Sequence, residues 1–391
     1  MRRKIAIILV LVLALGLLAA CNNNDNNTSG GNTGGGSNTG GGSNTGGGNT
    51  GGGNTGGGNT GGDAPPPDVD EPWADRPEVT LVLAGHDPDN SLPGEYVFAW
   101  ADAVYQESRG RILVEVHGGS TIAGATQVLD AAKSGIADIS FGLPSFYPGQ
   151  FPMTDVLIMP FAPFETSVQA SEAFWDIWEN TNLLQSDPGY SGLRVLLLRA
   201  NCDTPIITAS RKLSTADDMR GMRFRATIAP LQNWLAEFNA VGEGCPIGEL
   251  FQNLQNGTFD GALTDWHAIY AYRFYDNCAK YFADERVQWN MYFFVMNEGS
   301  YNRLSAENKA VIDRLSGPGA LAIMKDAWDE LTTRTHALVL AEAGNEIYTL
   351  PAAESARLRE AAERTNAAYV ASLGEPGRQL WERFSSHFPG N

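Results

Sequence analysis

Segments with strand periodicity alternate with segments of helical periodicity through residues 79–239, and this alternation limits the fold more than any other feature. The strand-like segments are 79–85, 111–116, 137–141, 193–200 and 222–226. The helical segments are 94–108, 125–135, 166–180, 214–219 and 230–239; beyond them the spacing is mostly helical, with an interruption at 345–350. Strands that alternate with helices form parallel crossovers, so the sequence predicts an α/β fold.

Residues 22–62 consist of Asn, Thr, Gly, Ser and one Asp, and they contain no apolar side chain that a core would bury. The sequence therefore predicts a flexible tether with a typical reach of roughly 35 Å. The segment "APPPDVDEP" that follows is stiff and marks the start of the folded region. We assign residues 22–75 to the tether and this Pro-rich boundary.

Residues 1–21 have the features of an export signal, because the basic run "MRRK" precedes an apolar stretch that ends in "LAAC". This ending resembles the lipobox of bacterial lipoproteins, in which the cysteine, here Cys21, is diacylated and becomes the N-terminus. Two acyl chains anchor a protein stably. The alternative is a membrane-spanning helix with Cys21 incidental, but the apolar run is short for a span. We therefore predict an exported protein held on the outer face of the cytoplasmic membrane, at the cell surface or in a periplasm.

The chain is acidic, with 45 Asp and Glu against 27 Lys and Arg and a formal net charge of −18. Such a surface repels nucleic acid and anionic lipid, so the charge argues against a phosphate-backbone partner. Hydrophobic residues make up 43% of the chain and include nine tryptophans, enough for the cores of about two domains.

Beyond Cys21 the chain has three cysteines, Cys202, Cys245 and Cys278, with no C-x-x-C pair and no zinc-ligand spacing. Export permits one disulfide, and Cys202 and Cys245 both follow predicted strands and are candidates to pair. Three buried free thiols are the alternative.

Motifs of catalysis are absent from the sequence. It contains no G-x-S-x-G, no H-E-x-x-H and no Walker A motif, and no G-x-G-x-x-G follows a strand. The five histidines are scattered, with none at the i, i+4 spacing of a helical metal site. We therefore expect neither an enzyme nor a cofactor or metal, although a catalytic pair of carboxylates among 45 is hard to recognise from sequence.

Four motifs in order give the body a specific resemblance. They are "GRILVEVHGGSTIAGATQVLDAAKSGIADIS", "YPGQFPMTDVLIMPF", "STADDMRGMRFRA" and "GELFQNLQNGTFDGALTDWHAI". From about residue 79 to about residue 388 the chain resembles the solute-binding P subunit of the TRAP transporters, the DctP-like family. No single motif is decisive, but four in the right order over most of the body are specific.

The resemblance implies a two-lobed, periplasmic-binding-protein-like α/β fold (type II-like) with discontinuous lobes, hinge strands and a long connecting helix. The lobes implied for this chain are 76–198 plus about 289–325, and 199–288 plus about 326–391. It further implies that a ligand binds between the lobes at the carboxyl ends of strands, that the lobes close around it, and that the loaded protein docks on two integral membrane subunits for ion-driven import.

In the family, an arginine at the end of the strand in the third motif pairs with the ligand carboxylate, and the matching residue is Arg225. A guanidinium offers two parallel donors to a carboxylate. Arg223 lies one pleat repeat earlier, about 6–7 Å away, on the same strand face. From alternation alone the two arginines are equivalent; the family position singles out Arg225, and Arg223 is expected to be solvated or salt-bridged.

Further ligand-binding candidates are polar or aromatic residues near strand ends, a helix start, the "PGQFP" stretch or a lobe crossover: His86, Gln127, Phe146, Tyr147, Asn201, Asp203, Thr264, Asp265, Trp266, Trp289 and Asn290. Trp266 either stacks on the ligand or belongs to the core. Asp265 departs from the family pattern. If its side chain faces the cleft, it repels a second carboxylate of the ligand and favours an amine or hydroxyl there. If it faces solvent, it has no effect on the choice of ligand.

These features predict a binding protein for a small organic acid. Two other functions stay open from sequence: the binding protein of an ATP-driven importer, and a sensing or surface-interaction lipoprotein that uses the same fold. The order of the motifs favours the TRAP system over an ATP-driven one.

Overall fold

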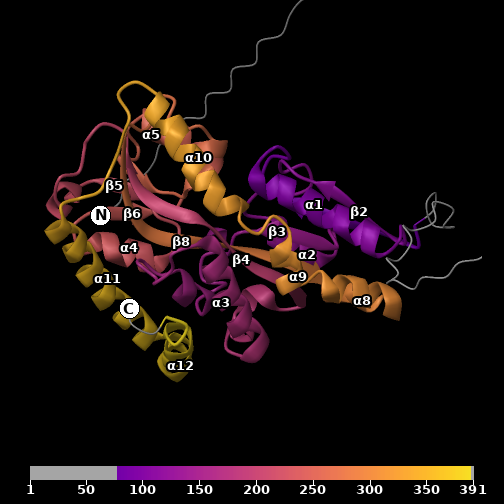
Figure 1. Cartoon of the computed structure of the whole chain (residues 1–391). Coiled ribbons are helices and arrows are strands. Elements are labelled where there is room, and N and C mark those ends of the chain that lie inside the picture. Colours follow the sequence, from indigo (N-terminus) through magenta and orange to yellow (C-terminus); the bar gives the residue numbers. More distant parts are fainter. Residues whose placement is uncertain (1–76, 389–391) are drawn as a thin grey trace, which may run out of the picture. The chain divides into compact units, whose positions relative to one another are not determined.

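The computed structural model describes residues 77–388 (Figure 1). The predicted signal segment with Cys21 and the tether lie outside the described residues. Among the described helices, none combines the length and the apolar character needed to cross a bilayer.

Residues 77–388 form one sheet with helices on both faces. The strands are β1 (Val79–Gly85), β2 (Ile112–His117), β3 (Ile139–Gly142), β4 (Leu193–Thr208), β5 (Arg223–Arg225), β6 (Val241–Glu243), β7 (Gly261–Leu263), β8 (Tyr281–Asn297) and β9 (Glu346–Tyr348). The helices are α1 (Leu92–Glu107), α2 (Val128–Ser134), α3 (Ser167–Asn180), α4 (Ala229–Ala236), α5 (Ile247–Gln255), α6 (Trp266–Ala271), α7 (Glu298–Asn302), α8 (Ala306–Arg314), α9 (Pro318–Ala322), α10 (Ala327–Ala341), α11 (Ala352–Ser372) and α12 (Gly374–Ser385).

The strand order is β2-β1-β3-β8-β4-β7-β5-β6, with β9 beside β8. β1 is parallel to β2 and β3, and β5 is parallel to β6 and β7, as the alternation of strands and helices predicts. The long strands β4 and β8 are antiparallel to each other and to their neighbours β7 and β3. The α/β fold is therefore confirmed, with a mixed sheet in which the strand predicted at 193–200 continues to Thr208.

Two groups of strands lie at opposite ends of the β4–β8 pair, and these groups are the two lobes (Figure 1). β2, β1 and β3 join at the end of β8, whereas β7, β5 and β6 join at the end of β4. Between them the β4–β8 register shifts twice, at Ala200/Asp203 and at Thr204/Ile206. Such bulges interrupt a ladder and bend the strand, so the lobes meet where the connecting strands are least regular. The residue limits assigned to the lobes stay a prediction.

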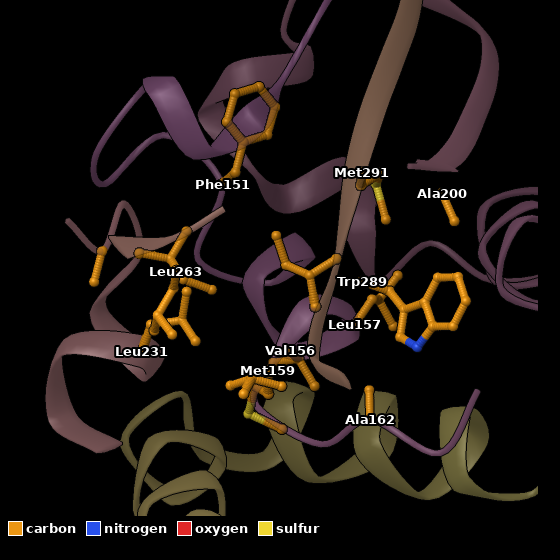
Figure 2. Close-up of a cluster of buried hydrophobic side chains, with 14 of the residues drawn as sticks. Phe151, Val156, Leu157, Met159, Ala162, Ala200, Leu231, Leu263, Trp289 and Met291 are labelled. Carbon is orange, nitrogen blue, oxygen red and sulfur yellow. The ribbon is translucent and has the colours of Figure 1, made fainter. Parts of the chain in front are cut away.

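A hydrophobic core lies on each face of the sheet, and the side chains of β8 alternate between the two. Phe293 and Val295 point into the core closed by α2, α3, α4, α11 and α12, part of which is drawn in Figure 2. Tyr292 and Phe294 point into the core closed by α1, α5, α6, α8, α9 and α10. This period of two is that of a strand buried on both faces.

The longest helix, α11, connects the two lobes along the first core. Near its start the carbonyl oxygen of Leu358 accepts a hydrogen bond of 2.9 Å from Trp234 Nε1 of α4. Two turns later Asn366 Nδ2 donates to the carbonyl of Pro160, at 2.8 Å, in the segment that precedes α3. The connecting helix expected from the resemblance is therefore present, and buried polar contacts fix it at two points along its length.

A pair of carboxyl groups lies beside this helix. Burial and the charge of neighbouring Asp187 raise the pKa of Asp155 to about 7, although Tyr369 Oη of α11 donates to it at 3.5 Å. Unfolded aspartate titrates at about pH 3.9. Between these two pH values Asp155 is protonated in the folded state and ionised in the unfolded state. The free energy of unfolding therefore falls as the pH rises through this window.

We expect Asp155→Asn to match the wild type in stability near pH 4 and to exceed it at pH 8 by on the order of 2 kcal/mol, because asparagine stays neutral. Chemical denaturation at the two pH values measures this. Asp102→Asn, on the exposed face of α1, controls for the loss of one negative charge. A pH-independent difference between wild type and Asp155→Asn would contradict the assignment.

Candidate functional site

A small, strongly polar cavity lies between the lobes at the irregular part of β4 and β8. It measures about 30 Å³ and is lined by His86, Asp87, Leu143, Phe146, Asn201, Arg225, Ile247, Thr264, Asp265, His267, Ala268, Tyr272, Asn290 and Tyr292. A space of this size holds about one or two waters. Two larger hollows, of about 330 and 620 Å³, lie beside Trp175. The interlobe cavity differs from them in the charged side chains of its lining that are almost fully buried, Asp87, Arg225 and Asp265.

The ends of strands from both lobes form its walls. His86 and Asp87 follow β1 directly, Arg225 ends β5, and Thr264 and Asp265 follow β7. Carboxyl ends of strands are the usual ligand-binding edge of an open α/β sheet. The alternation of strands and helices therefore brings to one place side chains as far apart in the chain as His86 and Asp265.

Arg225 is held by the local structure of β5. The turn before the strand has a capping box between Thr215 and Asp218 and a Gly221 with φ of +75°. Phe224 points into the core with no exposed surface, so Arg225 points to the opposite side. Gly261 of β7 lets the strands approach, since a Cβ there would lie 2.4 Å from the carbonyl oxygen of Ile207.

The two arginines of β5 have different surroundings. Arg223 is exposed and its Nη2 lies 2.7 Å from Glu243 Oε2, which confirms the expected salt bridge. Arg225 is 4% exposed, and its Nε donates to the carbonyl of Cys245 at 3.0 Å. Burial lowers the pKa of Arg225, but an arginine stays protonated at neutral pH. Within the described chain, no carboxylate forms an ion pair with Arg225.

That arrangement leaves a buried cation without a carboxylate partner among the described residues. A buried charge is costly unless it is paired and hydrogen-bonded. The carbonyl of Cys245 satisfies one donor of the guanidinium, and the ring centre of Phe146 lies 6.0 Å from its central carbon. A carboxylate that accepts from the remaining nitrogens would compensate the buried charge and satisfy the guanidinium in the bidentate geometry that it favours.

Acidic groups form another part of the wall. Asp87 accepts a hydrogen bond of 3.2 Å from Tyr292 Oη and lies 3.4 Å from His86 Nε2. Burial lowers the pKa of His86, so this ring is neutral at physiological pH. Asp265 caps α6 by accepting from the backbone N–H of Ala268 at 2.9 Å, and burial raises the pKa of Asp265.

Two asparagines of the connecting strands complete the polar lining. The side-chain carbonyl of Asn201 accepts from the N–H of Cys202, and that of Asn290 accepts from the N–H of Met291, both at 2.9 Å. Because the carbonyl oxygens are used locally, the amide nitrogens are the groups left as donors, and that of Asn290 already donates to Ser145 Oγ at 3.4 Å.

Seven of the twelve candidate ligand residues line this cavity: His86, Phe146, Asn201, Arg225, Thr264, Asp265 and Asn290. Their contact with a ligand stays a prediction. The structure also answers the question about Asp265, whose side chain faces the cleft and is 5% exposed.

Five candidates lie elsewhere, and each has a structural reason. Trp266 is fully buried against His336, at 4.2 Å between ring centres, so it belongs to the core. Tyr147 Oη donates to the carbonyl of Ala125 and accepts from the N–H of Leu129.

The other three candidates face away from the cavity as well. Gln127 is exposed and its side-chain oxygen accepts from the N–H of Gly124 at 3.4 Å. Trp289 lies within the hydrophobic cluster of Figure 2. Asp203 lies 3.6 Å from Arg286 Nε, outside the cavity lining.

Sequence reasoning missed four polar lining residues: Asp87, His267, Tyr272 and Tyr292. Asp87 had a usable signal, because it directly follows the predicted strand beside His86. His267 and Tyr272 belong to a short helix and its end, where no sequence period distinguishes a cleft face from a core face.

Within residues 77–388, no group of three or more His, Cys, Asp or Glu side chains is placed to hold a metal ion. Cys202, Cys245 and Cys278 are free thiols. The structure therefore favours the unpaired alternative for these cysteines, although Cys245 is half-buried where full burial was expected.

Residues 83–372 match the sequence profile of the DctP family, described as bacterial extracellular solute-binding protein, family 7. A curated relative, the uncharacterized protein y4mM of Sinorhizobium fredii, is 24% identical over 244 residues; the match covers 59% of this chain and 42% of that protein's length.

Solved structures share the fold at low identity. A TRAP solute-binding protein of an unidentified microbe from a marine metagenome, in complex with 3-hydroxybenzoate, is 24% identical with a TM-score of 0.73, over 80% of this chain and 98% of that one. A TRAP protein of Rhodoferax ferrireducens with copurified benzoate is 23% identical (TM-score 0.72, 79% and 97% covered). One of Bordetella bronchiseptica with (R)- and (S)-mandelate is 19% identical (TM-score 0.72, 79% and 98% covered).

The free thiols give a direct test. We expect peptide mapping of the exported protein to find Cys202, Cys245 and Cys278 alkylated by iodoacetamide under denaturing conditions without prior reduction, because no disulfide holds them. Reduction before alkylation should not change the pattern. A Cys202–Cys245 cross-linked peptide would contradict the structure at this point.

Proposed function

Because this chain belongs to the bacterial extracellular solute-binding proteins of family 7, we propose that it captures a small organic acid between its lobes. It then delivers the acid to the membrane subunits of a TRAP transporter, where an ion gradient drives import. The protein binds its ligand without converting it, and the lipid anchor and tether keep it near the transporter.

Arg225 carries this proposal. Its guanidinium is buried in the interlobe cavity without a carboxylate partner among the described residues, and the cavity edge beside it includes Phe146. A fixed cation in a water-poor cleft binds a carboxylate more strongly than an exposed one does. It also attracts an anion locally although the chain as a whole is strongly negative.

The ligands of similar proteins support an organic acid. 3-Hydroxybenzoate, benzoate and mandelate, which three TRAP proteins of this fold bind, each combine one carboxylate with an aromatic ring. In this chain the guanidinium of Arg225 would hold the carboxylate, and Phe146 would contact an apolar part of the ligand. Molecules of that size exceed the cavity of about 30 Å³, so the lobes must separate for entry and close less tightly over the ligand.

We expect Arg225→Ala to weaken binding of the preferred carboxylate by about 30-fold or more, because removing one partner of a buried charge pair costs about 2 kcal/mol at least. Thermal-shift screening against carboxylates finds the ligand, and calorimetry measures the affinity. Arg223→Ala is the matched control, since it removes the same charge from the exposed end of the same strand. Full affinity in Arg225→Ala would show that the assigned role is wrong.

The delivery step predicts a membrane partner without an ATPase. Cross-linking of the ligand-loaded protein in native membranes, followed by affinity purification, should recover two integral membrane components. The interaction should weaken when Arg225→Ala is used, because the ligand no longer stabilises the closed form. Recovery of an ATP-hydrolysing subunit would favour the ATP-driven importer instead.

A further inference from the structure

The interlobe cavity has more acidic groups than its one arginine can balance. Asp87 and Asp265 both line it and are each 5% exposed, and Arg225 is the only Lys or Arg among its lining residues in the described chain. The two histidines correct this imbalance at most in part: burial lowers the pKa of His86, and His267, whose Nδ1 is 3.9 Å from Asp265 Oδ1, compensates that one carboxylate only when its ring is protonated.

The hydrogen-bonding capacity of these acids is only partly used. Tyr292 Oη donates to Oδ2 of Asp87, and the Ala268 N–H donates to Oδ1 of Asp265. An ionised carboxylate accepts about four hydrogen bonds. His267, which is 2% exposed, has an Nε2 without a hydrogen-bond partner in the described chain. The acidic part of the cavity is therefore a built polar site with unsatisfied groups.

A simple monocarboxylate fits this site poorly. Its charge would be compensated by Arg225, but it would add a further anion to a buried space that holds Asp87 and Asp265 beside that one arginine. Like charges close together in a water-poor cavity repel strongly. A dicarboxylate would be worse, because its second charge has no basic lining residue to meet.

We propose that the ligand is a zwitterion, with a carboxylate held by Arg225 and a protonated nitrogen held by Asp87 and Asp265. This rests on the proposed function, which requires only that Arg225 binds a carboxylate. The ammonium or similar group donates to the open carboxylate oxygens and supplies the charge that the cavity lacks. The burial that raises the pKa of Asp265 is then offset, because a neighbouring cation favours the ionised acid.

Two matched series of probes test the inference by calorimetry with the purified protein at pH 7. One series is pentanoate, 4-hydroxybutanoate and 4-aminobutanoate, and the other is 3-ethylbenzoate, 3-(hydroxymethyl)benzoate and 3-(aminomethyl)benzoate. Within each series only the group opposite the carboxylate changes. We expect the amino member of a series that binds to bind at least about 10-fold more tightly than the methyl-ended member, with the hydroxyl member between.

Variants show which residues cause the preference. Asp265→Asn and Asp87→Asn should each reduce the amino-over-methyl ratio several-fold, because each weakens binding of the amino member and relieves repulsion of the methyl-ended member. Asp203→Asn removes a buried carboxyl outside the cavity lining and should leave the ratio unchanged. A ratio near one, a preference for the hydroxyl member, or failure of both amino members to bind would overturn the zwitterion assignment.

The two proposals fail separately. If Arg225→Ala abolishes binding of every member but no amino preference is seen, the carboxylate site stands and the zwitterion is wrong. If carboxylates bind and Arg225→Ala leaves their affinity unchanged, the proposed function itself is wrong.

Discussion

The antiparallel pairing of β4 and β8 is the constraint on which the rest of the structure depends. These two strands run through both lobes, and every other strand reaches the sheet through one of them. Their side chains supply both hydrophobic cores. Where their register shifts, between Ala200 and Ile206, the ladder is interrupted, and Asn201 and Asn290 face the cavity instead of continuing the apolar pattern. The irregular part of β4 and β8 between the lobes therefore also supplies polar side chains to the cavity lining.

Arg199 and Arg225 are both buried, but only Arg225 lines the interlobe cavity. Arg199 has no exposed surface, and its Nη2 donates to the carbonyls of Met324 and Lys325. Its guanidinium also stacks over Trp328, with the central carbon 3.7 Å from the ring centre. These contacts hold Arg199 within the protein, although its Nε and Nη1 have no hydrogen-bond partner among the described residues and burial lowers its pKa to about 10. Arg225 differs because it lines the interlobe cavity, where we propose that its remaining donors meet a ligand.

The sequence predicts many local elements because capping, glycine and periodicity act within a few residues. It misses β8, since mostly helix was predicted for the C-terminal third, whereas residues 281–297 form a strand that is buried on both faces and therefore shows no alternation of apolar and polar residues. The helix at 125–135 ends as expected at Gly135, with φ of +75°, and Phe174 is buried. Cleft residues are harder because they depend on distant contacts. Alternation places Asn201 and Asp203 on one strand face, but the bulge separates them: Asn201 lines the cavity while Asp203 meets Arg286.

Similar ambiguity affects neighbouring residues in short segments. Phe146 lines the cavity and Tyr147 packs in the core, and Asp265 lines the cavity while Trp266 packs against His336. In each pair one residue lines the cavity and its neighbour packs in the hydrophobic core. A helical segment of three to six residues is too short for the helical period of its sequence to distinguish the two. The motif position identified Arg225 because it fixes a place in the fold, whereas residue type alone did not separate it from Arg223.

The distribution of charge across the two lobes suggests why binding and closure are coupled. Arg225 and Asp265 belong to the lobe of β5 and β7, whereas Asp87 follows β1 in the other lobe. A ligand with only a carboxylate satisfies Arg225 equally well in an open or a closed protein, and it leaves Asp87 repelling the incoming charge. A ligand that also has a cationic end contacts Asp87 only when the lobes meet. Since a ligand shifts an equilibrium only by its differential affinity for the two states, the proposed second charge would convert occupancy of the site into closure.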